Sequence, residues 1–80
     1  MKIKVGDLVI FNLKYVLNKS SLYYEDFRKF KQHLKLGNYP LRVKKSKYWG
    51  DTFQLTLQNI RNKNIIFEVK HWEEKDFDSE

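Results

Sequence analysis

The chain has no cysteine, and this absence excludes several kinds of site. Disulfides, thiolate zinc sites and cysteine nucleophiles all need the missing thiol. No apolar run approaches the roughly 20 residues that a membrane-spanning helix requires. Residues 1–11 also lack the long apolar stretch and cleavage site of a secretion signal. We therefore expect a cytoplasmic protein without membrane contact.

Small residues are scarce and large rings are abundant: there is no alanine, but there are six Phe, five Tyr and two Trp. A chain this short hides only about two-thirds of its unfolded surface, so rings that each bury about 150–250 Å² help to fill its core. Lysine outnumbers arginine by 13 to 3, a bias typical of AT-rich coding such as that of bacteriophages.

Charge is divided unevenly along the chain. Residues 1–70 contain 15 basic and 5 acidic side chains, whereas residues 71–80 contain one lysine and five acids, for a net charge of +6. A basic body favours an anionic partner, most often nucleic acid, and an acidic end can tune that attraction. We expect one domain over residues 1–72 and an acidic, disordered tail over residues 73–80.

Residues 2–13 predict the first strand, because this stretch is apolar and rich in β-branched side chains. The apolar positions shift from odd numbers, Ile3 and Val5, to even numbers, Leu8 and Ile10. Gly6 stands where the phase changes, which indicates a β-bulge or a sharp bend.

One helix is predicted from Ser20 or Ser21, either of which can act as its N-cap, to Leu36. Gly37 and Pro40 end it. Its apolar stripe has the spacing of one helical face and consists of Tyr23, Phe27, Phe30 and Leu34.

Three further strands are predicted over residues 39–45, 52–60 and 65–72. Alternation places Leu41 and Val43 inward in the first of them. It places Phe53, Leu55 and Leu57 inward in the second, and Ile65, Phe67 and Val69 in the third. Short turns at residues 49–51 and 62–64 imply an antiparallel meander.

Residues 5–9, Val-Gly-Asp-Leu-Val, resemble the opening strand of SH3-like small barrels, including KOW-type modules. The resemblance implies an α+β, mainly β fold: a small bent antiparallel sheet or SH3-like barrel of about four to five strands. The helix over about residues 21–36 is then an insertion after the first strand. Such barrels bind RNA, DNA or protein segments, so the resemblance implies a binding module.

The first candidate site is a basic and aromatic segment within residues 42–49. Lysine and arginine attract phosphates, and an exposed ring can stack on an unpaired base. The alternative is a solvated strand edge whose lysines deter edge pairing while the tryptophan folds back onto the core. The candidate residues are Arg42, Lys44, Lys45, Lys47, Tyr48 and Trp49.

A second candidate line follows the outer helix face through Tyr24, Arg28, Lys31 and Lys35. The alternative here is the ordinary polar face of an amphipathic helix. A third, uncharged row on residues 52–60 consists of Gln54, Thr56 and Gln58, with Arg61 beyond it. This row is either a reader of base edges or the exposed side of a strand.

Two histidines complete the inventory of reactive groups. We expect His33 at the helix boundary and His71 near the tail acids, and neither has partners at metal-ligand spacing. A ribonuclease would need one of them beside Arg28 or Arg42, and nothing in the sequence pairs them. We expect no catalytic residue, no metal and no cofactor.

The sequence therefore favours a module that binds RNA or DNA through phosphates, with aromatic stacking and modest sequence preference. The main alternative is a protein-interaction module, such as a phage-encoded effector that binds an acidic host protein. A small ribonuclease-type toxin is the third hypothesis. The module is expected to be a monomer or a weak homodimer, because a small sheet often leaves an edge strand free.

Overall fold

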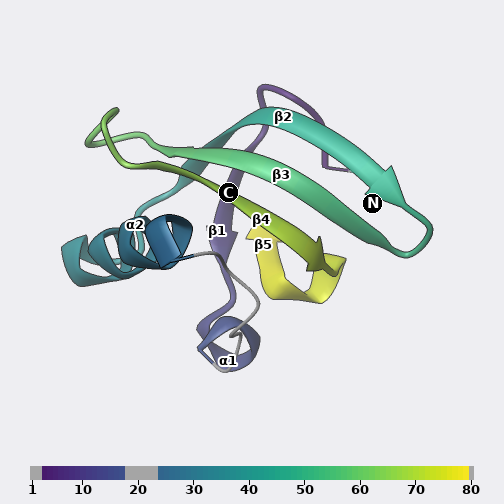
Figure 1. Ribbon diagram of the computed structural model, residues 1–80, viewed down its shortest axis with the longest axis horizontal. Helices are drawn as coiled ribbons and strands as arrows, with labels where there is room; N and C mark the ends of the chain where they lie inside the picture. The colour runs from purple at the N-terminus through teal and green to yellow at the C-terminus, as the bar shows by residue number, and fades with distance from the viewer. Residues whose placement is uncertain (1–2, 18–23, 80) are drawn as a thin grey trace.

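The computed structural model describes residues 3–17 and 24–79, which form one antiparallel sheet and its accompanying helices (Figure 1). The elements in chain order are β1 (Leu8–Phe11), α1 (Leu13–Val16), α2 (Tyr24–Leu36), β2 (Leu41–Trp49), β3 (Thr52–Asn59), β4 (Ile66–Trp72), the 3-10 helix η1 (Glu74–Asp76) and β5 (Phe77–Ser79). The strands lie in the order β4-β3-β2-β1-β5. The expected mainly β, α+β class is confirmed at this level.

β1 is shorter than the strand predicted over residues 2–13, because a tight turn precedes it. The Asp7 N–H donates to the Lys4 carbonyl at 3.0 Å, and the Asp7 carboxylate accepts the Lys4 N–H at 2.8 Å. Gly6 has a φ of +95°, a conformation that side chains with a Cβ rarely adopt. The predicted bend at Gly6 is confirmed.

The inward side of β1 differs from the predicted one. Val9 and Phe11 are buried, whereas Leu8 and Ile10 are half-buried. β1 lies between β2 and β5, so it is sheltered by neighbours on both edges. All four side chains are apolar, so the apolar pattern alone does not identify the core face.

A short helix, α1, takes the place of the end of the predicted strand. Asn12 caps it: its side-chain oxygen accepts the Lys14 N–H at 3.2 Å, and its carbonyl accepts the Val16 N–H at 3.1 Å. Val16 is completely buried. The Asn12 N–H donates to the Asp76 carbonyl at 2.9 Å, which ties this corner to the C-terminal segment.

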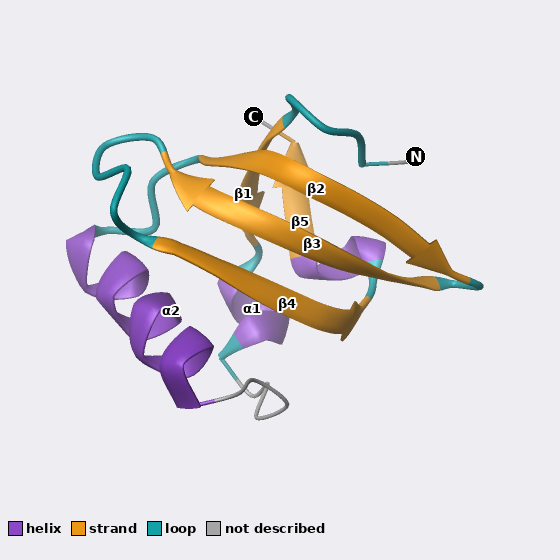
Figure 2. Ribbon diagram, turned by 45° about the horizontal axis from the view of Figure 1, so that its top comes forward, coloured by secondary structure: helices purple, strands orange, loops and turns teal. Residues whose placement is uncertain are grey.

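The predicted helix is present as α2, over Tyr24–Leu36, beside the β4 edge of the sheet (Figure 2). Phe30 is buried, while Phe27 and Leu34 are half-buried. Ser20, Ser21 and Tyr23 lie outside the described residues. The helix ends at Gly37, whose φ is +120° and whose N–H donates to the Leu34 carbonyl at 3.1 Å.

The predicted meander is present as β2, β3 and β4. β3 alternates without a break, so Phe53, Leu55 and Leu57 are buried as expected. β2 is longer than predicted and continues to Trp49. Its register with β3 shifts between Val43 and Lys45, which marks a β-bulge.

A second bulge lies at the end of β4. Phe53 pairs with Trp72 and Leu55 pairs with Val69, so β4 carries one extra residue between these pairs. His71, in that interval, has a φ of +59°. The extra residue turns Trp72 inward, and its side chain is fully buried.

The acidic C-terminal segment is part of the fold, which corrects the prediction of a disordered tail over residues 73–80. β5 pairs with β1 through Phe77↔Phe11, Ile10↔Asp78 and Val9↔Ser79. Asp76 is completely buried, and its carboxylate accepts the Glu73 N–H at 2.8 Å. Phe77 brings a large ring into the core, a stronger effect than the solvation of the neighbouring acids. Residue 80 lies outside the described part.

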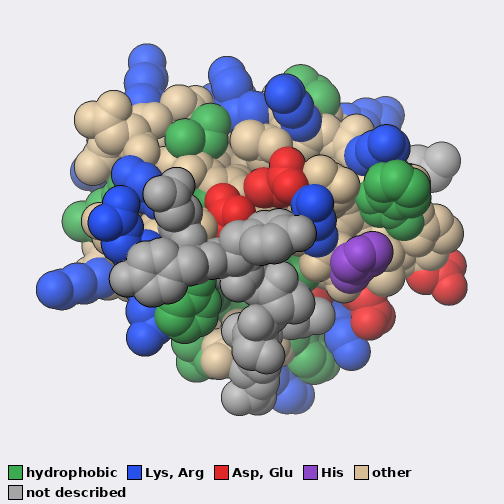
Figure 3. Space-filling model, viewed as in Figure 1, with side chains coloured by type: hydrophobic (Ala, Val, Ile, Leu, Met, Phe, Trp, Pro, Cys, Tyr) green, Lys and Arg blue, Asp and Glu red, His purple; other side chains and the backbone are tan. Residues whose placement is uncertain are grey.

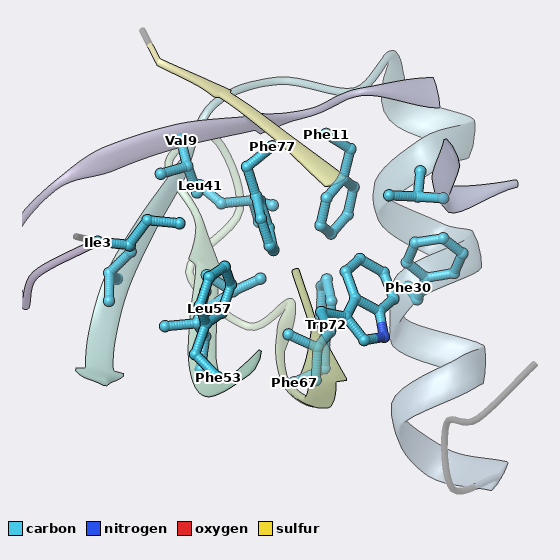
Figure 4. Packing of buried hydrophobic residues seen from close by; sticks show 14 of the residues in the cluster. Ile3, Val9, Phe11, Phe30, Leu41, Phe53, Leu57, Phe67, Trp72 and Phe77 are labelled. Carbon is cyan, nitrogen blue, oxygen red and sulfur yellow. The ribbon is translucent and has the colours of Figure 1, made fainter. Parts of the chain in front are cut away.

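Aromatic rings join the two ends of the sheet (Figure 4). The Phe77 ring of β5 lies 5.7 Å from the Trp72 ring of β4 and 5.7 Å from the Phe53 ring of β3, between centroids. β4 and β5 are the outermost strands in the sheet order, so the sheet is strongly bent. The described strand pairs do not connect these two edges, and the sheet is open.

Candidate functional site

The strand register defines one outward surface of the sheet, called here the β2–β3 face. Side chains of directly paired residues lie on the same side of an antiparallel sheet. The buried pair Val43↔Leu57 marks the inner side. The pairs on the opposite side are Arg42↔Gln58, Lys45↔Thr56, Lys47↔Gln54 and Trp49↔Thr52.

The bulge in β2 creates this face. Strict alternation from the buried Val43 would turn Lys45, Lys47 and Trp49 toward the core. The extra residue reverses the phase, so these three side chains point outward and are exposed. Lys44 lies within the bulge and is also exposed. The bulge thus decides which members of the predicted segment share a surface.

Trp49 presents its ring at the end of this face. It is 49% exposed, and the Lys47 ammonium lies 4.4 Å from the ring centroid. Its indole N–H donates to the Gln54 side-chain oxygen at 3.4 Å. The ring is therefore held near the sheet and remains accessible, as a stacking platform requires.

Two predicted residues of the same segment have other roles. Tyr48 points to the opposite side of β2, where its ring packs edge-on against Phe53 and its hydroxyl accepts the Ile3 N–H at 2.5 Å. Arg42 lies on the β2–β3 face, and its guanidinium donates to the Gly6 carbonyl at 3.1 Å. Tyr48 therefore does not join Trp49 in one aromatic surface.

The predicted uncharged row, with Arg61 beyond it, also separates into residues on the β2–β3 face and residues with other contacts. Gln54 and Thr56 are half-exposed on the β2–β3 face. Gln58 donates to the Lys63 carbonyl at 3.1 Å, so it braces the following turn. Arg61 lies beyond β3 and stacks its guanidinium 4.6 Å from the Tyr39 ring centroid.

β4 contributes two residues that the sequence analysis did not select. Thr56 pairs with Glu68, which places Glu68 on the β2–β3 face, and Lys70 follows two residues later. Their side chains form an ion pair at 3.7 Å. The predicted inward residues Phe67 and Val69 alternate with them, so this signal was present in the sequence.

A depression of about 290 Å³ lies in the middle of this face. It is slightly smaller than the about 300–1,000 Å³ of typical small-molecule pockets. Lysine, amide, hydroxyl and carboxylate groups meet at it. Its lining residues are Lys45, Ser46, Lys47, Gln54, Thr56 and Glu68.

The helix line forms a separate surface. Arg28, Lys31 and Lys35 are exposed on α2, and Lys31 lies 5.0 Å from the Phe27 ring centroid. The Tyr24 side chain lies outside the described part. α2 packs against β4, and β3 separates β4 from β2. The two predicted basic lines therefore lie on different elements of the fold.

Positive charge is also spread widely over the surface. On the side seen in Figure 3, Lys and Arg side chains lie around most of the margin, and a few acids lie near the centre and toward the lower right edge. An anion therefore meets a broad positive field in addition to local contacts.

His33 is a core residue, not the boundary residue expected from the sequence. Its Nδ1 accepts from the Asn59 amide at 2.8 Å, and its Nε2–H donates to the Asn38 oxygen at 3.2 Å. The partners fix this tautomer: Asn59 accepts the N–H groups of residues 61–62, and Asn38 donates to the Phe11 carbonyl. Burial lowers the pKa of His33 below its ordinary 6.5, while the Asn38 bond acts in the opposite direction.

The burial of His33 determines whether its ring can reach the substrate that the ribonuclease hypothesis requires. His33 is fully buried, so its ring cannot touch a phosphodiester, and His71 is exposed at the β4 bulge. Across residues 3–17 and 24–79, no three His, Asp or Glu side chains gather as metal ligands. Within the same residues, no helix is long and apolar enough to cross a membrane.

Comparisons with protein-family models, with curated proteins and with solved structures found no match.

Proposed function

We propose that this protein is a small nucleic-acid-binding module that contacts phosphates through the β2–β3 face, with modest sequence preference. One observation carries the proposal: Lys45, Lys47 and Trp49 project together from the outward side of β2 and are exposed. Lysines bind phosphates with little geometric demand, and stacking of a base on an aromatic ring contributes about 1–3 kcal/mol.

The proposed architecture is an SH3-like small barrel of the KOW type. The Val-Gly-Asp-Leu-Val bend before β1 and the pairing of β1 with both β2 and β5 support this assignment. The ring contact between Trp72 of β4 and Phe77 of β5, 5.7 Å between centroids, supports a sheet that curves toward closure. In this architecture, the β2–β3 face is the outer wall of the barrel.

Salt dependence of binding tests the proposed function. If three or four lysines of this face contact phosphates, the logarithm of affinity for a single strand should fall with log[salt] at a slope of about −2 to −3. Anisotropy of a fluorescent oligonucleotide, measured from 50 to 300 mM salt, gives this slope. Lys45→Ala should make the slope shallower by about 0.7. A slope near zero would refute the phosphate-binding role.

A second candidate, a protein-interaction module, is favoured by the edge of β2. The described ladder between β1 and β2 covers Leu8↔Arg42 and Val9↔Leu41, so it does not extend along residues 45–49. There the N-terminal segment is attached through side chains, as where the Ser46 hydroxyl donates to the Ile3 carbonyl. An acidic peptide that displaces this segment could add a strand at this edge. A stoichiometric protein partner that survives a high-salt wash, combined with flat oligonucleotide titrations, would favour this candidate.

A further inference from the structure

The depression on the β2–β3 face has one feature that phosphate binding does not explain. Its rim contains the carboxylate of Glu68 in addition to the ammonium groups of Lys45 and Lys47. Like charges repel, so a phosphate placed beside Glu68 would be less favourable than one beside the lysines. The depression therefore suits a different part of a nucleotide.

The backbone at Glu68 is fixed in place by the helix. Its N–H, on the outer edge of β4, donates to the Asp26 carboxylate of α2 at 3.1 Å. The side chain is less constrained, because the Glu68–Lys70 pair is 3.7 Å long and both side chains are more than a third exposed. Ion pairs of this kind contribute little, so the carboxylate can exchange Lys70 for a ligand donor.

We propose that this depression is a subsite for an unpaired base that carries an exocyclic amino group, namely cytosine, adenine or guanine. The inference rests on the proposed function. The backbone of a single strand lies along the lysines of β2, and one base turns toward β4. The exocyclic amino group of that base then donates to Glu68, as carboxylates accept from the cytosine N4 amino group.

Neighbouring side chains complete the subsite. Gln54 accepts from the indole of Trp49 through its oxygen, so its amide NH₂ is the group presented to a base. An amide donor suits the N3 and O2 acceptors of cytosine. Thymine has a carbonyl where cytosine has the amino group, so its O4 would face the Glu68 carboxylate. The adjacent base stacks on Trp49.

The test compares single strands of eight deoxycytidines and eight deoxythymidines, which have equal charge and similar size. Fluorescence anisotropy at pH 7.5 and low salt gives both affinities. We expect the native protein to bind the cytosine strand about 5- to 10-fold more tightly. Glu68→Gln should reduce this ratio to about 1, because the amide no longer prefers a donor.

Asp51→Asn is the matched control. Asp51 is exposed in the β2–β3 turn, and it does not line the depression. Its removal should strengthen binding of both strands equally and leave the ratio unchanged. Equal binding of the two strands by the native protein, or a ratio that survives Glu68→Gln, would overturn the subsite and leave the proposed function intact. Failure to bind either strand at low salt would overturn the proposed function itself.

Discussion

Replacing Asn59 with Asp should reverse the way in which stability depends on pH. In the native protein, His33 is neutral in the fold, and its pKa lies below the ordinary 6.5. The unfolded chain therefore takes up a proton near pH 6.5 when the folded chain does not. Stability should be fully present above about pH 6.5 and should decline as the pH falls below it.

The hydrogen-bond partners explain why charging His33 is unfavourable. A proton on Nδ1 would face the NH₂ of Asn59, since the oxygen of that amide already accepts two backbone N–H groups. Flipping the amide would leave those two N–H groups without an acceptor. An unsatisfied buried donor costs about 1–3 kcal/mol, and these two bonds are only partly buried, so each loss falls at the lower end of that range. Even so, the sum is a substantial share of the about 4–12 kcal/mol expected for a chain of this size.

The stability that acid can remove through His33 is limited by the ordinary histidine pKa of 6.5, which applies to the unfolded chain. Each pH unit below the ordinary pKa contributes at most about 1.4 kcal/mol, so lowering the pH to 5.0 removes up to about 2 kcal/mol through His33. A domain of this size shifts its Tm by about 4–8 °C for each kcal/mol. Thermal melts followed by circular dichroism should therefore show a decline in Tm between pH 7.5 and 5.0.

Asn59→Asp should reverse the pH dependence of stability, because a carboxylate at position 59 can accept from all three donors. These donors are the protonated Nδ1 of His33 and the backbone N–H groups of residues 61 and 62. An imidazolium can donate to Asp at position 59 through Nδ1 and to Asn38 through Nε2, so the pKa of His33 should rise above its ordinary value. The added stability is then fully present below about pH 6.5 and is lost as the pH rises through the raised pKa. His71→Asn serves as the comparison variant, because it removes the exposed histidine and keeps the hydrogen bonds of His33. The same downward trend with acid in Asn59→Asp would refute the assigned hydrogen-bond network.

Three further predictions concern single side chains. Phe77→Ala should lower the free energy of unfolding by about 3–5 kcal/mol in urea titrations, and a loss below about 1 kcal/mol would show that β5 is not part of the cooperative fold. His71→Val should destabilise by about 1–2 kcal/mol because of the positive φ at this position, whereas His71→Gly should be tolerated; equal losses would argue against the bulge conformation. Trp49→Ala should change stability by about 0.5 kcal/mol or less but weaken binding of a single strand about 5- to 150-fold; Tyr15→Ala, another exposed ring near lysines, should leave binding unchanged.

The helix and the meander are predictable because their signals are local and periodic. Phe53, Leu55 and Leu57 alternate over an uninterrupted strand, and Gly37 stands where α2 must end. Each of these patterns depends on residues within one element. Propensity and periodicity therefore suffice to place the elements and most of their inward faces.

Which residues lie on the β2–β3 face depends on longer-range information. One extra residue near Lys44 exchanges the inward and outward sets of β2, and alternation read from Val43 gives the opposite assignment. β5 was missed for a related reason: its acidic composition resembles a solvated end, while Phe77 finds its partners on β1, β3 and β4. Glu68 is predictable as an outward residue from the alternation of β4, but as an acid it falls outside the basic and aromatic pattern that predicted the site.

The pairing of β1 with β5 has a consequence for how the chain acquires its fold. Val9 pairs with Ser79, so one edge of β1 stays unpaired until the last strand arrives. Closing a long loop slows folding, because the entropy of closure precedes the contacts that compensate for it. During synthesis, the meander and α2 can assemble first, and the fold is completed only when residues 77–79 emerge from the ribosome. Until then, one edge of β1 presents unpaired backbone N–H and C=O groups to its surroundings.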